Sequence, residues 1–249
     1  TFMIIPLHIP TREQFTDEEL VAFCLSNPDL MVERDEFGQI FINISPTHLL
    51  TSSNNSELNT EIGIWNRRTK AGKVIDSNGG FFLADKSMRA PDVAWIHKTR
   101  WSQLSTAEKK SFPYLAPDFV LELESDTDNL EDLKQKMEKW ISNGVRLGWL
   151  VSMSEQQTYI YRPNIAPETT PFSEKLMGED VLIDFEVVFV TSFDHFAIEA
   201  IKFNALDYLL KPVEVNDLKA AVSKAGQRIL EKHSSAPLIV NLSANLTDE

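Results

Sequence analysis

Two short phrases, RAPDVAWI (Arg89–Ile96) and APDFVLELES (Ala116–Ser125), decide which fold this chain can adopt. Each is a run of apolar, strand-favouring residues with a carboxylate in its interior, Asp92 in the first and Glu122 in the second. A charge on a buried strand is costly unless it has a partner such as a metal ion or a basic side chain. The two phrases therefore predict neighbouring buried strands that carry a polar site.

The segment after these phrases predicts a helix and a closing strand. In TDNLEDLKQKMEKWISNGVRLGWLVSM (127–153), apolar residues recur at helical spacing from Leu130 to Ile141, and Asn143-Gly144 is a typical helix stop. The apolar run that follows has the composition of another strand. Two acidic strands, a helix that carries lysines and a closing strand together predict a compact α/β site.

The remaining segments predict further short elements. Thr16 to Glu19 has the S/T-x-x-E form of a capping box, so a helix should begin there and run to about Ser26. After it we expect a hairpin with its turn at 35–38, a helix over 54–70, two or three strands within 73–96, a short helix and loop over 99–117, a strand over 159–161 and a proline-rich loop through Pro163, Pro167 and Pro171. This order of helices and strands predicts a mixed α/β protein.

Composition limits the class of protein. A chain of 249 residues with 43% hydrophobic content can bury one good core, and its length allows one or two domains. No apolar run approaches the roughly 18 residues of a membrane span, and the opening residues lack a secretory signal, so we expect a cytoplasmic protein without a membrane partner. The single Cys24 can form neither an intramolecular disulfide nor a zinc cluster.

The net charge of −13 argues against broad electrostatic affinity for nucleic acid, which usually appears as a basic surface. Two local basic clusters nevertheless occur, one at Arg67, Arg68, Lys70 and Lys73, the other at Lys98, Arg100, Lys109 and Lys110. Either cluster could follow a phosphate backbone. Ordinary solvated helix ends and loops explain these residues at least as well.

A family resemblance rests on several of these motifs in order. A Pro-Asp strand is followed by a second strand with Pro-Asp and then an acid, a helix with Lys136 four residues before Trp140, and the strand GVRLGWLV (144–151). Over about residues 15–185 this pattern resembles the Uma-type restriction endonucleases of the PD-(D/E)XK nuclease superfamily. The resemblance implies an α/β (α+β) mixed sheet with a restriction-endonuclease-like αβββαβ core. It also implies a Mg²⁺- or Mn²⁺-dependent endonuclease that hydrolyses DNA phosphodiester bonds.

The same resemblance assigns the central catalytic residues. Asp92 and Glu122 would supply two hard oxygen ligands to the divalent ion. Lys136 would orient or deprotonate the attacking water, although Lys134 flanks the opposite edge of the same apolar stripe and is the alternative. Glu124 stands where the superfamily usually has its lysine. Strand alternation puts Glu124 on the side of Glu122, which makes it a further candidate metal ligand.

More peripheral candidates come from the hairpin and the second helix. Glu33 lies in the hairpin, where the family commonly has an acid, and it faces either the site or solvent. Superfamily members often present an acid from the second helix, where Glu57 and Glu61 lie four residues apart on one face and either could serve. At the end of that helix, the candidates for contact with a nucleic-acid backbone are Arg67, Arg68 and Lys70.

From Phe185 onward the sequence changes character. Residues 185–233 resemble the second half of a response-regulator receiver domain, of the kind linked to LytTR DNA-binding domains. Thr191 and Lys211 match the site hydroxyl and the Lys of the Lys-Pro pair that bind a phosphoryl group. The front half of a receiver, with its acceptor Asp, is missing. The resemblance therefore implies a βαβα fragment, and phosphorylation signalling by this chain alone is not expected.

Together these observations predict three parts and two alternative functions. The parts are an endonuclease-like domain (1–185), a receiver-like fragment (186–233) and a polar tail (234–249). For a nuclease, DNA is the expected partner, and a homodimer is compatible with the class. The alternative is a catalytically degenerate regulatory or interaction protein in which the receiver-like segment mediates association. Net acidity and the displaced lysine favour this alternative, whereas the combination of Asp92, Glu122 and Lys136 favours the nuclease.

Overall fold

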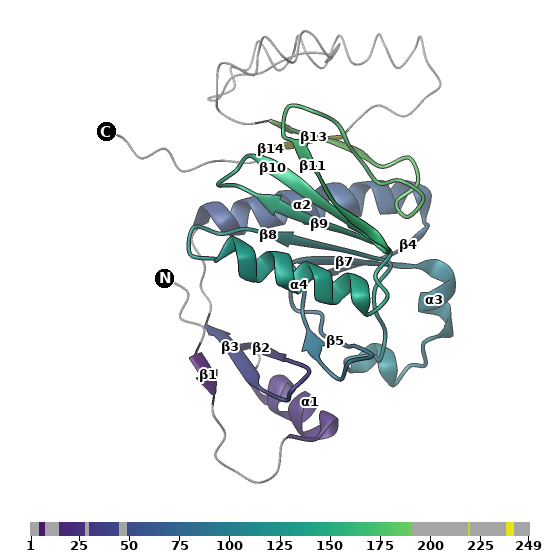
Figure 1. Ribbon diagram of the computed structural model, residues 1–249. Helices are drawn as coiled ribbons and strands as arrows, with labels where there is room; N and C mark the ends of the chain where they lie inside the picture. Colours follow the sequence, from purple (N-terminus) through teal and green to yellow (C-terminus); the bar gives the residue numbers. More distant parts are fainter. Residues whose placement is uncertain are drawn as a thin grey trace.

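A mixed β-sheet lies at the centre of the protein (Figure 1). The computed structural model describes residues 5–7, 15–27, 30–44, 49–190, 219 and 238–241. Within them the six strands of this sheet follow the order β11-β10-β9-β8-β7-β4. Their bounds are β4 Gly72–Asp76, β7 Val93–His97, β8 Phe119–Leu123, β9 Leu147–Ser152, β10 Gln157–Arg162 and β11 Ile165–Pro171. The predicted mixed α/β class is confirmed.

Helix α4 (Leu130–Ser142) explains why β8 and β9 are parallel, because parallel neighbours need a long crossover connection. Every residue of β8 and β9 is buried, as expected for strands covered on both faces. Met137 and Trp140 of α4 pack on one face against residues such as Val120. Figure 1 shows α4 crossing the sheet on the opposite side from α2.

Helix α2 (Leu49–Thr69) covers the other face through Leu58, Ile62 and Trp65. It begins ahead of the expected start at residue 54. The early turn contributes no buried apolar side chain, so hydrophobic periodicity could not reveal it. None of the helices in the described part of the chain combines the length and apolar character of a membrane span.

A second sheet brings the N-terminal hairpin beside the central sheet. Its order is β1-β3-β2-β6-β5, with bounds β1 Ile5–Leu7, β2 Leu30–Arg34, β3 Ile40–Ile44, β5 Phe81–Phe82 and β6 Met88–Arg89. Helix α1 (Asp17–Ser26) packs on it through Leu20, and the predicted Thr16–Glu19 capping box is present. Because β6 leads within a few residues into β7, the chain passes from one sheet to the other just before Asp92.

Of two connecting segments whose structure was predicted, the first matches the prediction and the second does not. Residues 99–117 contain the expected short helix and loop, as α3 (Lys98–Gln103) and the 3-10 turn η1 (Glu108–Lys110). The expected proline-rich loop is instead strand β11, so that prediction was wrong. β11 lies at the edge of its sheet, where a proline without an N–H costs no inner ladder hydrogen bond.

The end of the described chain adds a small third sheet. β12 (Leu176–Met177), β13 (Glu186–Val190) and β14 (Leu238–Asn241) lie in the order β12-β13-β14, with β13 and β14 parallel. Val187 and Phe189 of β13 belong to the core that α2 and the central sheet share. Thr191, Lys211 and the expected receiver-like helix and strand between them lie outside the described residues.

Candidate active site

The candidate site lies at the end of the central sheet where β7 begins and β8 ends. The antiparallel register pairs Val93 with Leu121, so Asp92 and Glu122 come opposite each other. Asp92 precedes β7 and accepts a hydrogen bond at its Oδ2 from the backbone N–H of Leu123, at 2.8 Å. The carboxylates of the two acidic phrases are thus neighbours because of the strand register.

Helix α4 directs Lys136 toward these carboxylates. Lys136 Nζ lies 3.0 Å from Glu122 Oε1 and 3.1 Å from Glu33 Oε1. It also donates to the carbonyl of Ala90 at 3.3 Å. Lys134 points elsewhere: it pairs with Glu131 at 2.7 Å and lies over the ring of Tyr159. The structure therefore brings Lys136, and not Lys134, to the acids.

Glu33 on β2 faces the site rather than solvent. Its Oε1 accepts a hydrogen bond from the Ala90 N–H at 2.9 Å in addition to the contact with Lys136. Arg89 lies 3.8 Å from its other carboxylate oxygen. The hairpin thus closes the site on the side away from the central sheet and holds the ammonium of Lys136 between acids.

Burial and charge shift the proton affinities of these groups. For Glu122, burial is the largest cause and raises the pKa to about 7, with Lys136 opposing and Asp92 adding to the rise. Burial also raises the pKa of Asp92, opposed by the Leu123 N–H. Burial would raise the pKa of Glu33 as well, but Lys136 and Arg89 outweigh it and the pKa is lowered.

Lys136 shows the opposite balance. Burial would lower the pKa of Lys136, but the carboxylates of Glu122, Glu33 and Asp92 outweigh it, so its pKa lies above the ordinary value. Lys136 is therefore an ammonium in this arrangement. The carboxylates of Glu33, Asp92 and Glu122 outnumber the cations of Lys136 and Arg89. The raised pKa values of Asp92 and Glu122 mean that their charged forms are disfavoured here, so a cation would be favoured in place of the proton.

Glu124 lies on the same strand but has other partners. Its carboxylate accepts hydrogen bonds from the Ser152 hydroxyl at 2.7 Å and from the Ser154 N–H at 3.0 Å. The Ser154 hydroxyl donates to it as well, at 2.8 Å. Because these donors lie at the end of β9 and in the following turn, the structure directs Glu124 to the serines rather than to Asp92.

The second helix contributes an amide instead of the expected acid. Glu61 forms no hydrogen bond or salt bridge with the site residues in the described part of the chain. Burial and neighbouring Glu57 raise its pKa. Asn55, earlier on α2, reaches the site, with its Nδ2 3.4 Å from Asp92 Oδ1. The sequence signal that could have revealed Asn55 is its place less than one turn before Leu58, the first buried apolar residue of α2.

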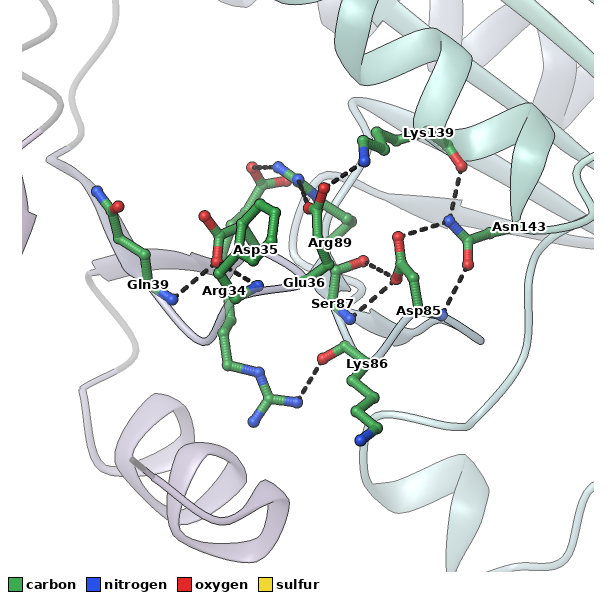
Figure 2. A network of polar contacts seen from close by, with 12 residues as sticks. Arg34, Asp35, Glu36, Gln39, Asp85, Lys86, Ser87, Arg89, Lys139 and Asn143 are labelled. Atoms are coloured by element: carbon green, nitrogen blue, oxygen red, sulfur yellow. Dashed lines mark hydrogen bonds and ion pairs between the residues drawn. The ribbon is translucent and has the colours of Figure 1, made fainter. Parts of the chain in front are cut away.

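Two further polar partners were not anticipated. Trp140 donates from its ring N–H to Glu122 at 2.9 Å, so the aromatic residue after the lysine also orients the acid. Figure 2 shows Arg89 and Lys139 around Glu36 at the hairpin turn. Arg89 lies 3.8 Å from Glu36, and Lys139 pairs with the same carboxylate. This network ties the hairpin that carries Glu33 to α4, which carries Lys136.

The fold brings Lys98 of the second basic cluster beside the first cluster, away from the acids. Arg67 and Arg68 are in the last turn of α2, and the Lys98 N–H donates to the Ala71 carbonyl at 2.8 Å. The pairing of Gly72 with His97 places this surface at the end of β7 opposite to Asp92. The exposed side chains of Arg67, Arg68, Lys70, Lys73 and Lys98 form no salt bridge within the described part of the chain.

Metal-ligating side chains of the usual kinds are sparse at this site. Within the ranges that the structure describes, no three His, Cys, Asp or Glu side chains form a cluster that could hold a metal ion. Asp92 and Glu122 are the two carboxylates of the predicted set that lie together. Other oxygens, such as side-chain amides and backbone carbonyls, would have to complete an oxygen-rich site.

Comparisons with known proteins agree with this architecture. Residues 17–191 match the model of the Uma2 family, which is described as "Putative restriction endonuclease". A crystal structure from Anabaena variabilis, of a "putative nuclease belonging to DUF820", superposes with a TM-score of 0.51 at 19% identity. The match covers 61% of this chain and 83% of that one. At this identity the likeness concerns the fold, and it supports the predicted restriction-endonuclease-like architecture.

A second match is shorter and concerns a different kind of protein. An uncharacterized response regulatory protein of Vibrio cholerae serotype O1 is 47% identical over 51 residues. The matched segment is 20% of this chain and 20% of that protein, so the chain spans about a fifth of its relative's length.

Proposed function

This chain belongs to the Uma2 family, and we propose that it is a divalent-metal-dependent endonuclease that hydrolyses phosphodiester bonds in DNA. The observation that carries the proposal is the convergence of Asp92, Glu122 and Lys136 on one largely buried site. Asp92 lies just before β7, whereas Glu122 is on β8 and Lys136 on α4, so the three residues come from separate segments of the sequence. Such a gathering of groups with shifted pKa values is more typical of a catalytic site than of a structural ion pair.

The donor set suits Mg²⁺ or Mn²⁺. Asp92 and Glu122 offer hard carboxylate oxygens, and a divalent cation would stabilise their charged forms, which burial disfavours. When bound, such an ion supplies Lewis-acid activation of water and of the phosphate. The protein's own contribution is to hold the two carboxylates opposite each other through the β7–β8 register.

Lys136 would act through its positive charge. Because its pKa is raised, the ammonium is suited to orienting the attacking water and to offsetting negative charge on the phosphate in the transition state. Removal of a proton from water would need a neutral amine, which this environment disfavours. Glu33 would position the ammonium, because its carboxylate contacts the same Nζ atom that Glu122 contacts.

A manganese titration by calorimetry tests the proposal most directly. Wild-type protein should bind Mn²⁺, and Asp92→Asn should weaken binding by at least about tenfold because it removes a charged ligand at nearly constant shape. Asp132→Asn is the matched control, since Asp132 is exposed on the first turn of α4. In Mg²⁺, the wild type and Asp132→Asn should cleave DNA, and Asp92→Asn should cleave it much more slowly or not at all. Unchanged affinity and cleavage in Asp92→Asn would refute the site assignment.

Absence of Mn²⁺ binding by the wild-type protein would favour the alternative function, a regulatory or interaction protein with a degenerate nuclease fold. In that case residues 186–233, which resemble part of a receiver, are the segment to test for association. Light scattering of the full chain, with and without Glu186→Lys, would then measure self-association. The same measurement tests the homodimer that a nuclease cutting both strands would form.

A further inference from the structure

One side-chain atom beside Asp92 lacks the partner that its burial demands. The Oδ1 atom of Asn55 is buried and accepts no hydrogen bond. Buried polar atoms are normally paired, and an exception at the edge of a candidate site calls for a functional explanation. Within the described part of the chain, only a few other buried side-chain atoms share this property, namely Arg89 Nε, Trp149 Nε1 and Thr158 Oγ1. Asn55 Oδ1 is the acceptor among them that belongs to a neighbour of Asp92.

The geometry between Asn55 and Asp92 suits a shared cation. Asp92 uses Oδ2 to accept from the Leu123 N–H, which leaves Oδ1 turned toward Asn55. The Asn55 Nδ2 is 3.4 Å from that Oδ1. A half-turn of the amide exchanges its nitrogen and oxygen at nearly the same place. Two oxygens at adjacent positions around one octahedral ion, each about 2.1 Å from it, lie about 3 Å apart, which is close to the observed spacing.

We propose that Asn55 supplies an amide oxygen ligand to the divalent ion that Asp92 holds, an inference that rests on the proposed metal-dependent function. The amide suits both states of the site. Without an ion, its N–H group faces the Asp92 carboxylate, as it does in the structure. With an ion, its oxygen faces the cation and adds no further negative charge to the acids already present. Asn55 thus takes the place on α2 for which Glu57 and Glu61 were the candidates.

Two substitutions at Asn55 separate a ligand from a hydrogen-bond donor, with Mn²⁺ affinity measured by calorimetry. Asn55→Ala should weaken binding by about 10- to 100-fold, the range for losing a group that supports a metal site. Asn55→Asp should bind at least as tightly as wild type, because it retains an oxygen and adds charge. Asn59→Ala, one turn further along α2, is the matched control and should leave affinity unchanged.

If Asn55 is only structural, the Mn²⁺ affinities of the two variants should fall in the opposite order. If it only donates to the Asp92 carboxylate, Asn55→Asp places two like charges together and should be the more damaging change. Thermal melts give an independent readout: the Asn55→Asp protein should melt lower than wild type without Mn²⁺ and show the larger rise when Mn²⁺ is added.

The outcomes separate this inference from the proposed function. Wild-type binding with unchanged affinity in Asn55→Ala, or weaker binding in Asn55→Asp than in Asn55→Ala, overturns the role of Asn55 and leaves Asp92 and Glu122 in place. A wild-type protein that binds no Mn²⁺ overturns both.

Discussion

At the scale of single residues, Lys136 is held by acids on two sides, and its removal should be costly in two ways. Lys136→Met keeps the length of the side chain but leaves Glu122 and Glu33 buried without their cation. Unfolding free energy should fall by about 3–5 kcal/mol, the cost of breaking a buried ion pair. DNA cleavage should fall by at least about 100-fold. Urea denaturation and a cleavage assay measure the two effects.

The matched control is Lys134→Met, because Lys134 is on the same helix but pairs with the exposed Glu131. Its stability should change by less than about 1 kcal/mol and its cleavage rate should stay near wild type. An equal loss of cleavage in both variants would contradict the assignment of Lys136.

The protonation of Glu122 predicts a dependence of stability on pH. Its folded-state pKa of about 7 lies above the ordinary value of 4.5, so the folded protein binds the proton more tightly than the unfolded chain. Stability contributed by the protonated acid is therefore present below pH 4.5 and is lost as the pH rises to about 7. Between these two pH values, the free energy of unfolding of the wild type should fall by about 2–3 kcal/mol more than that of Glu122→Gln. Paired urea titrations at several pH values check this, and parallel pH profiles would contradict it.

At the scale of elements, strand β13 is part of the core. Phe189 is buried and its ring centroid lies 4.7 Å from that of Phe172, next to Val187 in the same cluster. Phe189→Ala should lower the unfolding free energy by about 3–5 kcal/mol. Ile183→Ala is the control, because Ile183 is 62% exposed. Because β13 contributes Val187 and Phe189 to the core, a chain that ends after Leu182 should be insoluble. A soluble, stable truncation would show that β13 is dispensable.

At the scale of the whole molecule, the basic surface made of Arg67, Arg68, Lys70, Lys73 and Lys98 offsets the objection raised by a net charge of −13. We expect this surface to contact phosphates. In the Asp92→Asn background, which we expect to lack cleavage, changing Arg67, Arg68 and Lys70 to Gln should weaken DNA binding. The slope of log K against log salt should become shallower by about 0.9 for each phosphate that the variant no longer neutralises.

Lys175→Gln is the control for the DNA-binding measurement, since Lys175 is exposed and paired with Glu186. Fluorescence anisotropy at several salt concentrations supplies the slopes. Equal slopes in the triple variant and the control would show that this surface does not bind DNA.

The sequence by itself determined most of the elements and the segments that carry charge. Strands β7 and β8 and helix α4 were predictable because β-propensity, helical periodicity and stop signals act over a few neighbouring residues. The same local rules failed at β11. Its prolines read as a loop because the sequence does not say that the strand lies at an edge.

Only the tertiary structure decided which charged side chains meet. Lys136 and Lys134 flank one apolar stripe, and the rotation of α4 on the sheet turned Lys136 toward Glu122 of β8. Lys134 instead pairs with Glu131, its neighbour on the same helix, and lies over the ring of Tyr159. The packing of α2 likewise brought Asn55, rather than Glu61, to Asp92. Contacts between distant segments depend on strand register and on helix rotation, which local patterns do not specify. For that reason the acids could be predicted one by one and Lys136 only as one of two lysines, whereas the contacts of Asn55 and Trp140 with these acids could not be predicted.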